Sequence, residues 1–344
     1  MKISQNFSEA QKRLFQEIQN NLSSQYVLVD IISDVLNIGL DSAYRRIRCD
    51  KLLSIKETYM LCEHFKISFD ALIGVKNIHQ FDCIYRPINL SMPNEYHNYM
   101  FALSKNVDKL RTSADSNILM SATDIPIFYL TSQKELRFFK LYTWTHSVYN
   151  YEGCLDDFIK TIETPEIVSC HQQISRAYEL IPSAEIWTEN TINSTLRLIS
   201  YYIDIGRFSN KDLPLLLCEQ ILNILEKLQK WAETGQKGNH TTSFQFYVSE
   251  MELENTYILM RRSGMMNCVV KLFTINSLNV FDKEFCMETE NWLTKLSQRS
   301  VLLCENSEKE RIKFFNAQRQ KVNILIDKIH DSINKRYYFT DVII

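Results

Sequence analysis

The spacing of apolar residues over residues 1–75 predicts a series of short helices. Residues 29–36 carry apolar side chains at intervals of three and four, which places them on one face of a helix. The Asn-Ile-Gly sequence at residues 37–39 interrupts this spacing, and Gly39 can either adopt a positive φ or cap the next helix. A tight turn between two helices is therefore expected at residues 37–39.

The next helix is predicted over residues 40–48 and has two unlike sides. An α-helix advances by about 100° per residue, so Leu40, Ala43 and Ile47 fall on one narrow apolar face. The remaining positions are polar or aromatic and include three arginines, with a lysine just beyond: Asp41, Ser42, Tyr44, Arg45, Arg46, Arg48 and Lys51. The apolar face can pack tightly on the preceding helix, and the polar side suits the major groove of DNA.

Short polar signals mark further helices on either side of this pair. Ser54 and Glu57 have the S-x-x-E spacing of a capping box. Ser8 with Gln11 is predicted to cap a first helix, and Ser68 to cap a last short one. The sequence thus predicts a domain of five helices that needs no strand.

Two stretches of the chain resemble the helix-turn-helix of Xre/Cro-like and BetR-like bacterial transcriptional regulators: SAYRRIRCDKLLSIKE and LCEHFKISFDALIG. Many of those regulators read S-x-x-R-R-I-R-G-E-K-x-L-S, followed by L-x-x-H-F-x-I-S-x-D. The chain departs from that pattern at two positions, with Cys49 where glycine is common and Gly39 where a serine cap is common. The resemblance covers about the first fifth of the chain and implies that residues 40–48 form a recognition helix for double-stranded DNA.

This resemblance gives each polar position of the recognition helix an expected contact. Arg45 is expected to read a base edge, because arginine can donate two hydrogen bonds to guanine. Asp41 and Ser42 lie near Arg45, and Tyr44 lies at the boundary of the polar side. Phosphate contacts are expected from three cations: Arg46, Arg48 and Lys51. The alternative is that these charges form an ordinary solvated face on a compact helical domain.

The distribution of charge favours a reader of short DNA sites over a general nucleic-acid coat. The whole chain has a formal net charge of −2, and residues 1–75 hold nine basic and nine acidic residues. Four of these nine basic residues lie between Arg45 and Lys51. A local basic patch without a global excess cannot neutralise a long phosphate backbone.

The cysteines and the hydropathy of the chain indicate a cytoplasmic protein. Nine cysteines are scattered without a C-x-x-C pair or a Cys/His metal spacing, which is typical of reduced thiols in a cytosol. The amino terminus is polar, and no run approaches the roughly 18 apolar residues that a membrane span needs. We therefore expect no bound metal and no contact with a membrane.

Residues 76–344 are expected to form a larger, mostly helical domain for effector binding or oligomerisation. Only 7 glycines and 6 prolines occur in the whole chain, and so few helix breakers favour long helices. The apolar spacing predicts such helices over residues 94–112, 182–205, 213–234 and 306–336. A small antiparallel sheet is predicted within residues 244–278, where apolar runs flank a turn at Ser263 and Gly264. The expected fold class is therefore mainly α.

Residues 76–344 contain no motif that indicates an enzyme or a cofactor. The chain has no P-loop, no dinucleotide fingerprint, no H-E-x-x-H and no G-x-S-x-G, so no catalysis and no cofactor are expected. One aromatic group can form core or line a ligand pocket: Phe138, Phe139, Tyr142, Trp144, Tyr149 and Tyr151. One stripe on the last helix can form a dimer seam or pack within its own domain: Phe315, Val322, Ile326, Ile329 and Ile333.

The leading hypothesis is a cytoplasmic, sequence-specific transcriptional regulator that binds double-stranded DNA as a homodimer. Residues 76–344 then sense an unidentified effector ligand or protein, or assemble the subunits. A helical protein-interaction scaffold without DNA binding is the second hypothesis, and an enzyme with an unrecognised site is the third. Salt-dependent binding of residues 1–75 to duplex DNA separates the first two hypotheses.

Overall fold

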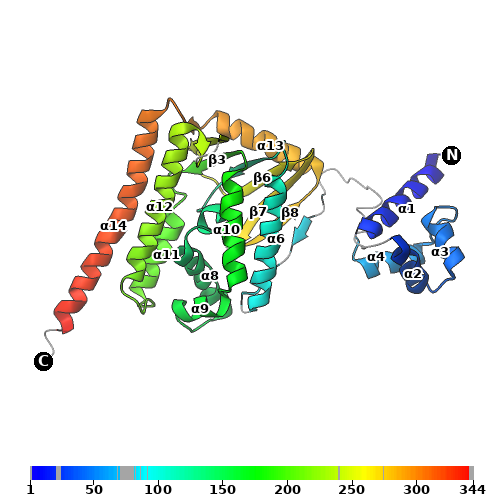
Figure 1. Ribbon diagram of the computed structural model, residues 1–344, viewed down its shortest axis with the longest axis horizontal. Helices are drawn as coiled ribbons and strands as arrows, with labels where there is room; N and C mark the ends of the chain where they lie inside the picture. Colours follow the sequence, from blue (N-terminus) through cyan, green and yellow to red (C-terminus); the bar gives the residue numbers. More distant parts are fainter. Residues whose placement is uncertain are drawn as a thin grey trace. The chain divides into compact units, whose positions relative to one another are not determined.

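The computed structural model describes these residues of the chain: 2–20, 25–67, 69, 81, 83–85, 87–90, 92–238, 241–273 and 275–340. The chain divides into two compact units, Met1–Asp82 and Cys83–Ile344 (Figure 1). The sequence places a domain boundary after residue 75. That position lies outside the described residues, so the boundary stays a prediction.

The first unit is a bundle of short helices around one apolar core. Its described helices are α1 (Lys2–Asn20), α2 (Gln25–Leu36), α3 (Leu40–Ile47) and α4 (Ile55–Phe65). Side chains from all four helices fill the core: Leu14, Phe15, Ile18, Leu28, Val29, Ile32, Leu36, Ala43 and Leu61. The fifth helix, which the sequence predicts to begin near Ser68, lies almost wholly outside the described residues.

The second unit is built on a nine-stranded mixed sheet, which corrects the expectation of a mainly α fold with a small antiparallel sheet. Its strands are β1 (Cys83–Tyr85), β2 (Asn117–Ser121), β3 (Ser183–Thr188), β4 (Gln236–Lys237), β5 (Thr242–Ser249), β6 (Tyr257–Arg262), β7 (Met265–Phe273), β8 (Asn276–Val280) and β9 (Val301–Leu302). Their order across the sheet is β1-β8-β7-β6-β2-β3-β5-β4, with β9 paired to β5. The sheet and its helices make this unit a mixed fold of helices and strands.

The centre of the sheet is parallel, and its flank is an antiparallel meander. β3 runs parallel to both neighbours, with Ser183 opposite Ile118 of β2 and Phe244 of β5. On its other side β2 pairs antiparallel with β6, and β6, β7 and β8 follow one another as neighbours. Ser263 and Gly264 have φ values of 49° and 74° between β6 and β7, so the predicted hairpin turn is confirmed.

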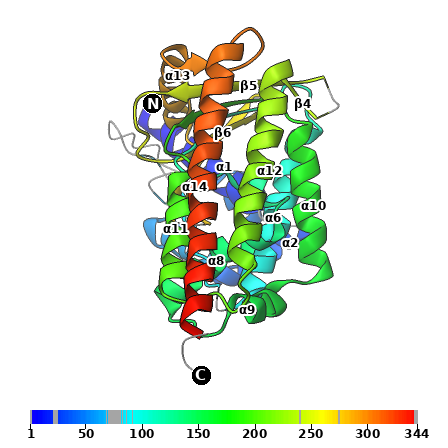
Figure 2. The same ribbon diagram turned by 90° about the vertical axis from the view of Figure 1, so that its left-hand side faces the viewer.

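Helices cover both faces of the sheet. They are α6 (Pro93–Arg111), α7 (Ile127–Leu130), α8 (Lys134–Tyr149), α9 (Leu155–Ile162), α10 (Pro165–Glu179), α11 (Asn193–Asp204), α12 (Leu213–Thr234), α13 (Lys283–Gln298) and α14 (Glu308–Thr340). The larger core lies on the face covered by α6, α8, α10, α12 and α14. Figure 2 looks onto this helical layer, where α14 lies beside α12. On the other face Leu293 of α13 packs with Ile186 of β3 and Leu259 of β6.

The single helix predicted over residues 182–205 is wrong, because this stretch holds strand β3 and helix α11. In β3, Ile186 is buried in one core and Trp187 in the other. A strand that is buried on both faces lacks the alternation of apolar and polar residues, so its pattern resembles that of a buried helix. The other long helices predicted for this part of the chain are found as α6, α12 and α14.

Two apolar groups that the sequence left open pack inside the second unit. Phe138, Phe139 and Tyr142 of the aromatic group are buried in its larger core. Phe315 and Val322 of α14 are fully buried in the same core, so these positions of the stripe pack within their own unit.

Within the described part of the chain, no helix combines the length and the apolar character that crossing a membrane requires.

Candidate nucleic-acid interface

A three-residue turn joins α2 to α3. Asn37 follows α2 in the left-handed region with a φ of 51°, and the N–H of Ile38 donates to the carbonyl of Ser33 at 3.0 Å. Gly39 is the N-cap of α3 in an extended conformation, with a φ of −67°. Of the two roles expected for Gly39, the structure shows the cap, while Asn37 takes the positive φ. A turn of this length occurs in helix-turn-helix motifs and in other helical hairpins.

One side of α3 packs on α2. Ala43 is fully buried, and Ile47 is half-buried against the same core. Leu40 differs from the expectation, because 51% of its surface is exposed at the first turn of the helix. The apolar contact of α3 with the core is therefore made mainly by Ala43, and the opposite side of the helix faces outwards.

The outward side of α3 presents most of the residues that the sequence predicts for DNA contact. Ser42 is half-buried, and five of the predicted residues are exposed: Asp41, Tyr44, Arg45, Arg48 and Lys51. Among the described residues, none forms an ion pair with Arg45. Arg48 Nε lies 3.8 Å from Asp50 Oδ2, and both side chains are more than half exposed, so this pair holds Arg48 only weakly. Two arginines on this surface therefore remain available to a negatively charged partner.

Arg46 is the exception, because the structure turns it inwards. Its side chain is only 6% exposed, and its Nη2 atom donates to Glu57 Oε1 at 2.5 Å. Its Nη1 atom also donates to the carbonyl of Ser42 at 3.1 Å. A buried guanidinium that is bonded to an internal carboxylate cannot reach a phosphate. The predicted phosphate contact is therefore replaced by a positioning role for Arg46.

Glu57 connects α3 to the start of α4. Its second oxygen accepts from the N–H of Ser54 at 2.8 Å, and the N–H of Glu57 donates to Ser54 Oγ at 3.2 Å. These two bonds form the capping box that the sequence predicts. Burial works to raise the pKa of Glu57, but the bonds from Arg46 and Ser54 outweigh it and lower that pKa. One carboxylate thus caps α4 and fixes the rotation of α3.

Gln11 positions the loop after α3, a role that the sequence pattern did not predict. The predicted cap at Ser8 and Gln11 is wrong, because α1 begins at Lys2 and both residues lie inside it. The Nε2 atom of Gln11 donates to the carbonyls of Arg46 and Lys51 at 2.7 and 2.9 Å, and its Oε1 atom accepts from the N–H of Leu53 at 2.8 Å. These bonds fix the loop that carries Lys51.

The signal for Gln11 is present in the apolar spacing of α1. Leu14, Phe15 and Ile18 form the buried face of that helix, and Gln11 falls on the same face at the preceding turn. A polar residue on a buried face requires hydrogen-bond partners, because an unsatisfied amide in a core costs free energy. Its position therefore indicates a structural amide, although the spacing alone does not identify the loop to which it bonds.

The loop after α3 contains a residue in the left-handed region. Cys49 has a φ of 62°, and this is the position where the regulators that the sequence resembles commonly have glycine. Its N–H donates to the carbonyl of Arg46 at 2.9 Å, which turns the chain away from the helix axis. The departure in sequence thus leaves the turn in place, and a side chain occupies a conformation that favours glycine.

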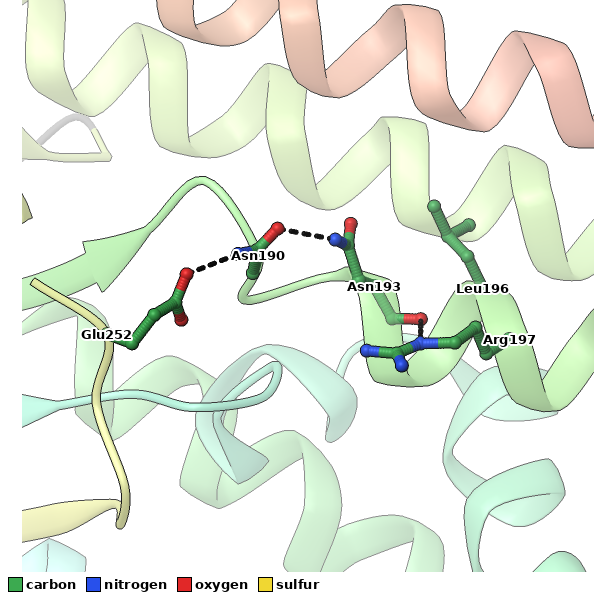
Figure 3. Close-up of a pocket in the computed structure, with 5 residues that line it drawn as sticks. All are labelled: Asn190, Asn193, Leu196, Arg197 and Glu252. Atoms are coloured by element: carbon green, nitrogen blue, oxygen red, sulfur yellow. Dashed lines mark hydrogen bonds between the residues drawn. The ribbon is translucent and has the colours of Figure 1, made fainter. Parts of the chain in front are cut away.

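In the second unit, a wide hollow lies beyond the carboxyl ends of β3 and β5. Its volume is about 540 Å³, and five residues line it: Asn190, Asn193, Leu196, Arg197 and Glu252 (Figure 3). Asn190 donates to Glu252 and accepts from Asn193 Nδ2 at 2.7 Å, while Arg197 Nε donates to the carbonyl of Asn193 at 3.4 Å. Asn190, Asn193 and Glu252 thus bond to one another across this hollow.

Comparisons of the chain with protein-family models, with curated proteins and with solved structures give no significant match. The likeness of the first unit to helix-turn-helix regulators is therefore a resemblance in its motif only.

Proposed function

We propose that the protein is a sequence-specific DNA-binding transcriptional regulator that inserts α3 into the major groove. The observation that carries this proposal is the contrast between neighbouring arginines on one short helix. Arg46 is buried on Glu57, while Arg45 and Arg48 point outwards without a buried partner. An internal ion pair that fixes the rotation of the helix also fixes where the two outer guanidinium groups lie.

The proposed contacts follow from the position of each residue along α3. In helix-turn-helix proteins the first part of the recognition helix contacts base edges. Asp41, Ser42 and Arg45 are therefore assigned to base readout, with Arg45 donating to guanine. Arg48 and Lys51 follow at the end of the helix and in the loop, where they suit phosphate contacts.

One recognition helix covers only a half-site, so the regulator is proposed to act as a homodimer on paired half-sites. The Cys83–Ile344 unit is proposed to supply effector binding or the contact between subunits. This proposal agrees with a soluble location in the cytoplasm, which the scattered cysteines of the sequence favour.

A protein-interaction scaffold is the second candidate, and one observation favours it. Ile55 and Tyr59 lie one turn apart on α4 and are 88% and 62% exposed. Exposed apolar side chains at this spacing suit contact with a partner protein. A scaffold function, however, does not account for the exposed arginines of α3. DNA binding does account for them and remains the leading proposal.

Binding of the full-length chain to duplex DNA tests the proposal. Fragments are first selected from random duplex DNA, and affinity for the selected site is then measured at several salt concentrations. Affinity is expected to fall as salt rises, because cations that neutralise phosphates release counterions. A double variant, Arg45→Ala with Arg48→Ala, is expected to lose most of this binding.

The control is Arg176→Ala, which removes an exposed arginine from α10 in the second unit. This variant should bind like the unaltered chain. Absence of duplex binding at low salt, or equal binding by the double variant, would reject DNA binding by α3 and favour the scaffold.

A further inference from the structure

A small cavity lies inside the second unit between helices α6, α7 and α8 and the strands β6 and β7. Its volume is about 80 Å³, less than the roughly 300–1,000 Å³ of most ligand pockets, so by itself it holds only a small apolar group. Most of its lining is apolar or aromatic, including Tyr99, Ile127, Leu130, Ile258 and Val269. Three cations also line it: Arg137, Lys140 and Lys271. An apolar cavity with a few charged groups is the usual form of a ligand site.

The cavity adjoins a more polar hollow of about 290 Å³. Asp124, Lys140, Thr256 and Lys271 line both spaces, so the charged groups stand at the passage from the polar hollow to the apolar cavity. The loop after β2 supplies Asp124, while α8 supplies Lys140 and β7 supplies Lys271. This arrangement offers a path for a molecule that has one charged end and one apolar end.

Asp124, a carboxylate that lines both spaces, already has partners for both of its oxygens. Asp124 forms an ion pair with Lys140, and its Oδ1 atom accepts from Thr195 Oγ1 at 2.9 Å and from the N–H of Ile125 at 2.8 Å. Burial works to raise the pKa of Asp124, but Lys140 and Lys271 outweigh it and lower that pKa to about 2. The carboxylate thus lies in a strongly positive surrounding.

The two other cations interact with carboxylates only at longer range, Lys271 with Asp124 and Arg137 with Glu163 and Glu135. Among the described residues, none forms an ion pair with Lys271 or with Arg137. Arg137 is only 7% exposed; its Nη1 atom donates to the carbonyl of Thr131 at 2.8 Å, while its Nε atom has no hydrogen-bond partner. Lys140 and Lys271 therefore share the carboxylate of Asp124, so one positive charge is left uncompensated there, and a buried uncompensated charge is costly.

We propose that this cavity binds a small organic carboxylate, with its acid group facing Lys271 at the passage and its apolar part against Tyr99, Ile127 and Val269. The positive charge left over where Lys140 and Lys271 share Asp124 calls for an anion. The apolar walls call for a hydrocarbon or aromatic body that inorganic anions lack.

Ligand binding at this cavity is independent of DNA binding, but a role for the carboxylate as the effector of a regulator rests on the proposed function. The two are tested by separate measurements. Affinity for the carboxylate is measured on the full-length chain without DNA, and a failure of DNA binding leaves that measurement unaffected.

The test is calorimetric titration of the full-length chain with hexanoate and with benzoate. The corresponding amides, hexanamide and benzamide, have the same shape without the charge, and inorganic phosphate has a charge without an apolar part. The two carboxylates are expected to bind, and the amides and phosphate to bind at least about tenfold more weakly, because each lacks one of the two interactions. This comparison needs no variant and therefore no assumption about folding.

The matched variants are Lys271→Met and Lys283→Met. Lys283 is an exposed lysine on α13, so its replacement makes the same change of charge elsewhere on the unit. Lys271→Met is expected to weaken carboxylate binding about tenfold or more, and Lys283→Met to leave it unchanged. The proposal is overturned if neither carboxylate binds, if the amides or phosphate bind as tightly as the carboxylates, or if Lys271→Met binds like the unaltered chain.

Discussion

Glu57 accepts a hydrogen bond from Arg46 at 2.5 Å across the gap between α3 and α4. The same carboxylate accepts from the N–H of Ser54, which caps α4. Glu57 therefore links α3 to the start of α4. Because Arg46 adjoins Arg45 in the sequence, holding Arg46 inwards also determines the direction in which Arg45 projects. The stability of this buried pair and the orientation of the proposed DNA-binding surface are therefore linked.

Replacing Glu57 with alanine is expected to destabilise the first unit by about 3 kcal/mol, because it leaves the buried guanidinium of Arg46 without a counter-charge. All four tryptophans lie beyond residue 140, so hydrogen exchange of α3 peptides is a better probe than fluorescence. Arg46→Leu combined with Glu57→Gln should recover much of the protection, since glutamine can keep the capping box. Unchanged exchange of α3 in Glu57→Ala would show that the pair does not hold the helix.

Replacing Cys49 with glycine is expected to stabilise the first unit by about 1 kcal/mol, because a side chain at a φ of 62° is strained and glycine is not. Cys49→Ala is the matched control, since it removes the thiol and keeps the strain. Hydrogen exchange of the loop and of α3 measures both variants. Equal exchange in the two variants would mean that the left-handed conformation costs little at this position.

Arg45→Ala is expected to weaken binding to a selected DNA site by about 1–3 kcal/mol and to weaken binding to random duplex DNA much less. The reason is that a bidentate contact to guanine exists only at the correct site. Titration of both DNAs under the same salt conditions gives the ratio. A loss of the same size on both DNAs would show that Arg45 contacts the phosphate backbone and not a base.

Lys51→Ala should lower affinity for both DNAs alike and reduce the slope of the salt dependence by about 1. Lys51 is exposed in the loop that Gln11 fixes, and a phosphate contact from it carries no sequence information. Its control is Lys56→Ala, which removes an exposed lysine from the first turn of α4. An unaltered slope in Lys51→Ala would exclude the phosphate contact.

Acid should destabilise the second unit between about pH 4 and pH 2 through Asp124. The folded state lowers the pKa of this carboxyl to about 2, so the stabilising contribution is present above its ordinary pKa and is lost as the pH falls towards 2. From the ordinary value of about 3.9, this contribution is about 2 kcal/mol. Denaturant unfolding followed by tryptophan fluorescence reports this unit, and Asp124→Asn should show a much smaller change over that interval.

Local signals in the sequence predict the first unit better than the second. The capping box of Ser54 and Glu57 spans four residues, and the apolar spacing of α2 and α3 needs only the helical period, so both features could be found in advance. The burial of Arg46 could not, because a helical period places it on the flank of α3 and its partner lies on another helix. Which flank turns inwards depends on that tertiary contact.

The sheet escaped prediction for a different reason. Ile118 and Met120 of β2 face one core and Leu119 the other, so the strand is a short apolar run without alternation. Its neighbours are β3 and β6, which are distant in the sequence. In contrast, α12 was predicted correctly because twenty-two residues with one apolar face and a glycine at the end are a local signal. The proposed carboxylate cavity is lined by residues from elements that are distant in the sequence, so no local motif predicts it.

The pairing of β2 with both β3 and β6 also bears on the order of events during synthesis. The helices of the first unit contact one another over short stretches of chain, and such units fold rapidly. Strand β2 can pair on both edges only after Ser183 of β3 and then Tyr257 of β6 have left the ribosome. The growing polypeptide therefore carries a finished amino-terminal bundle well before the sheet behind it can close.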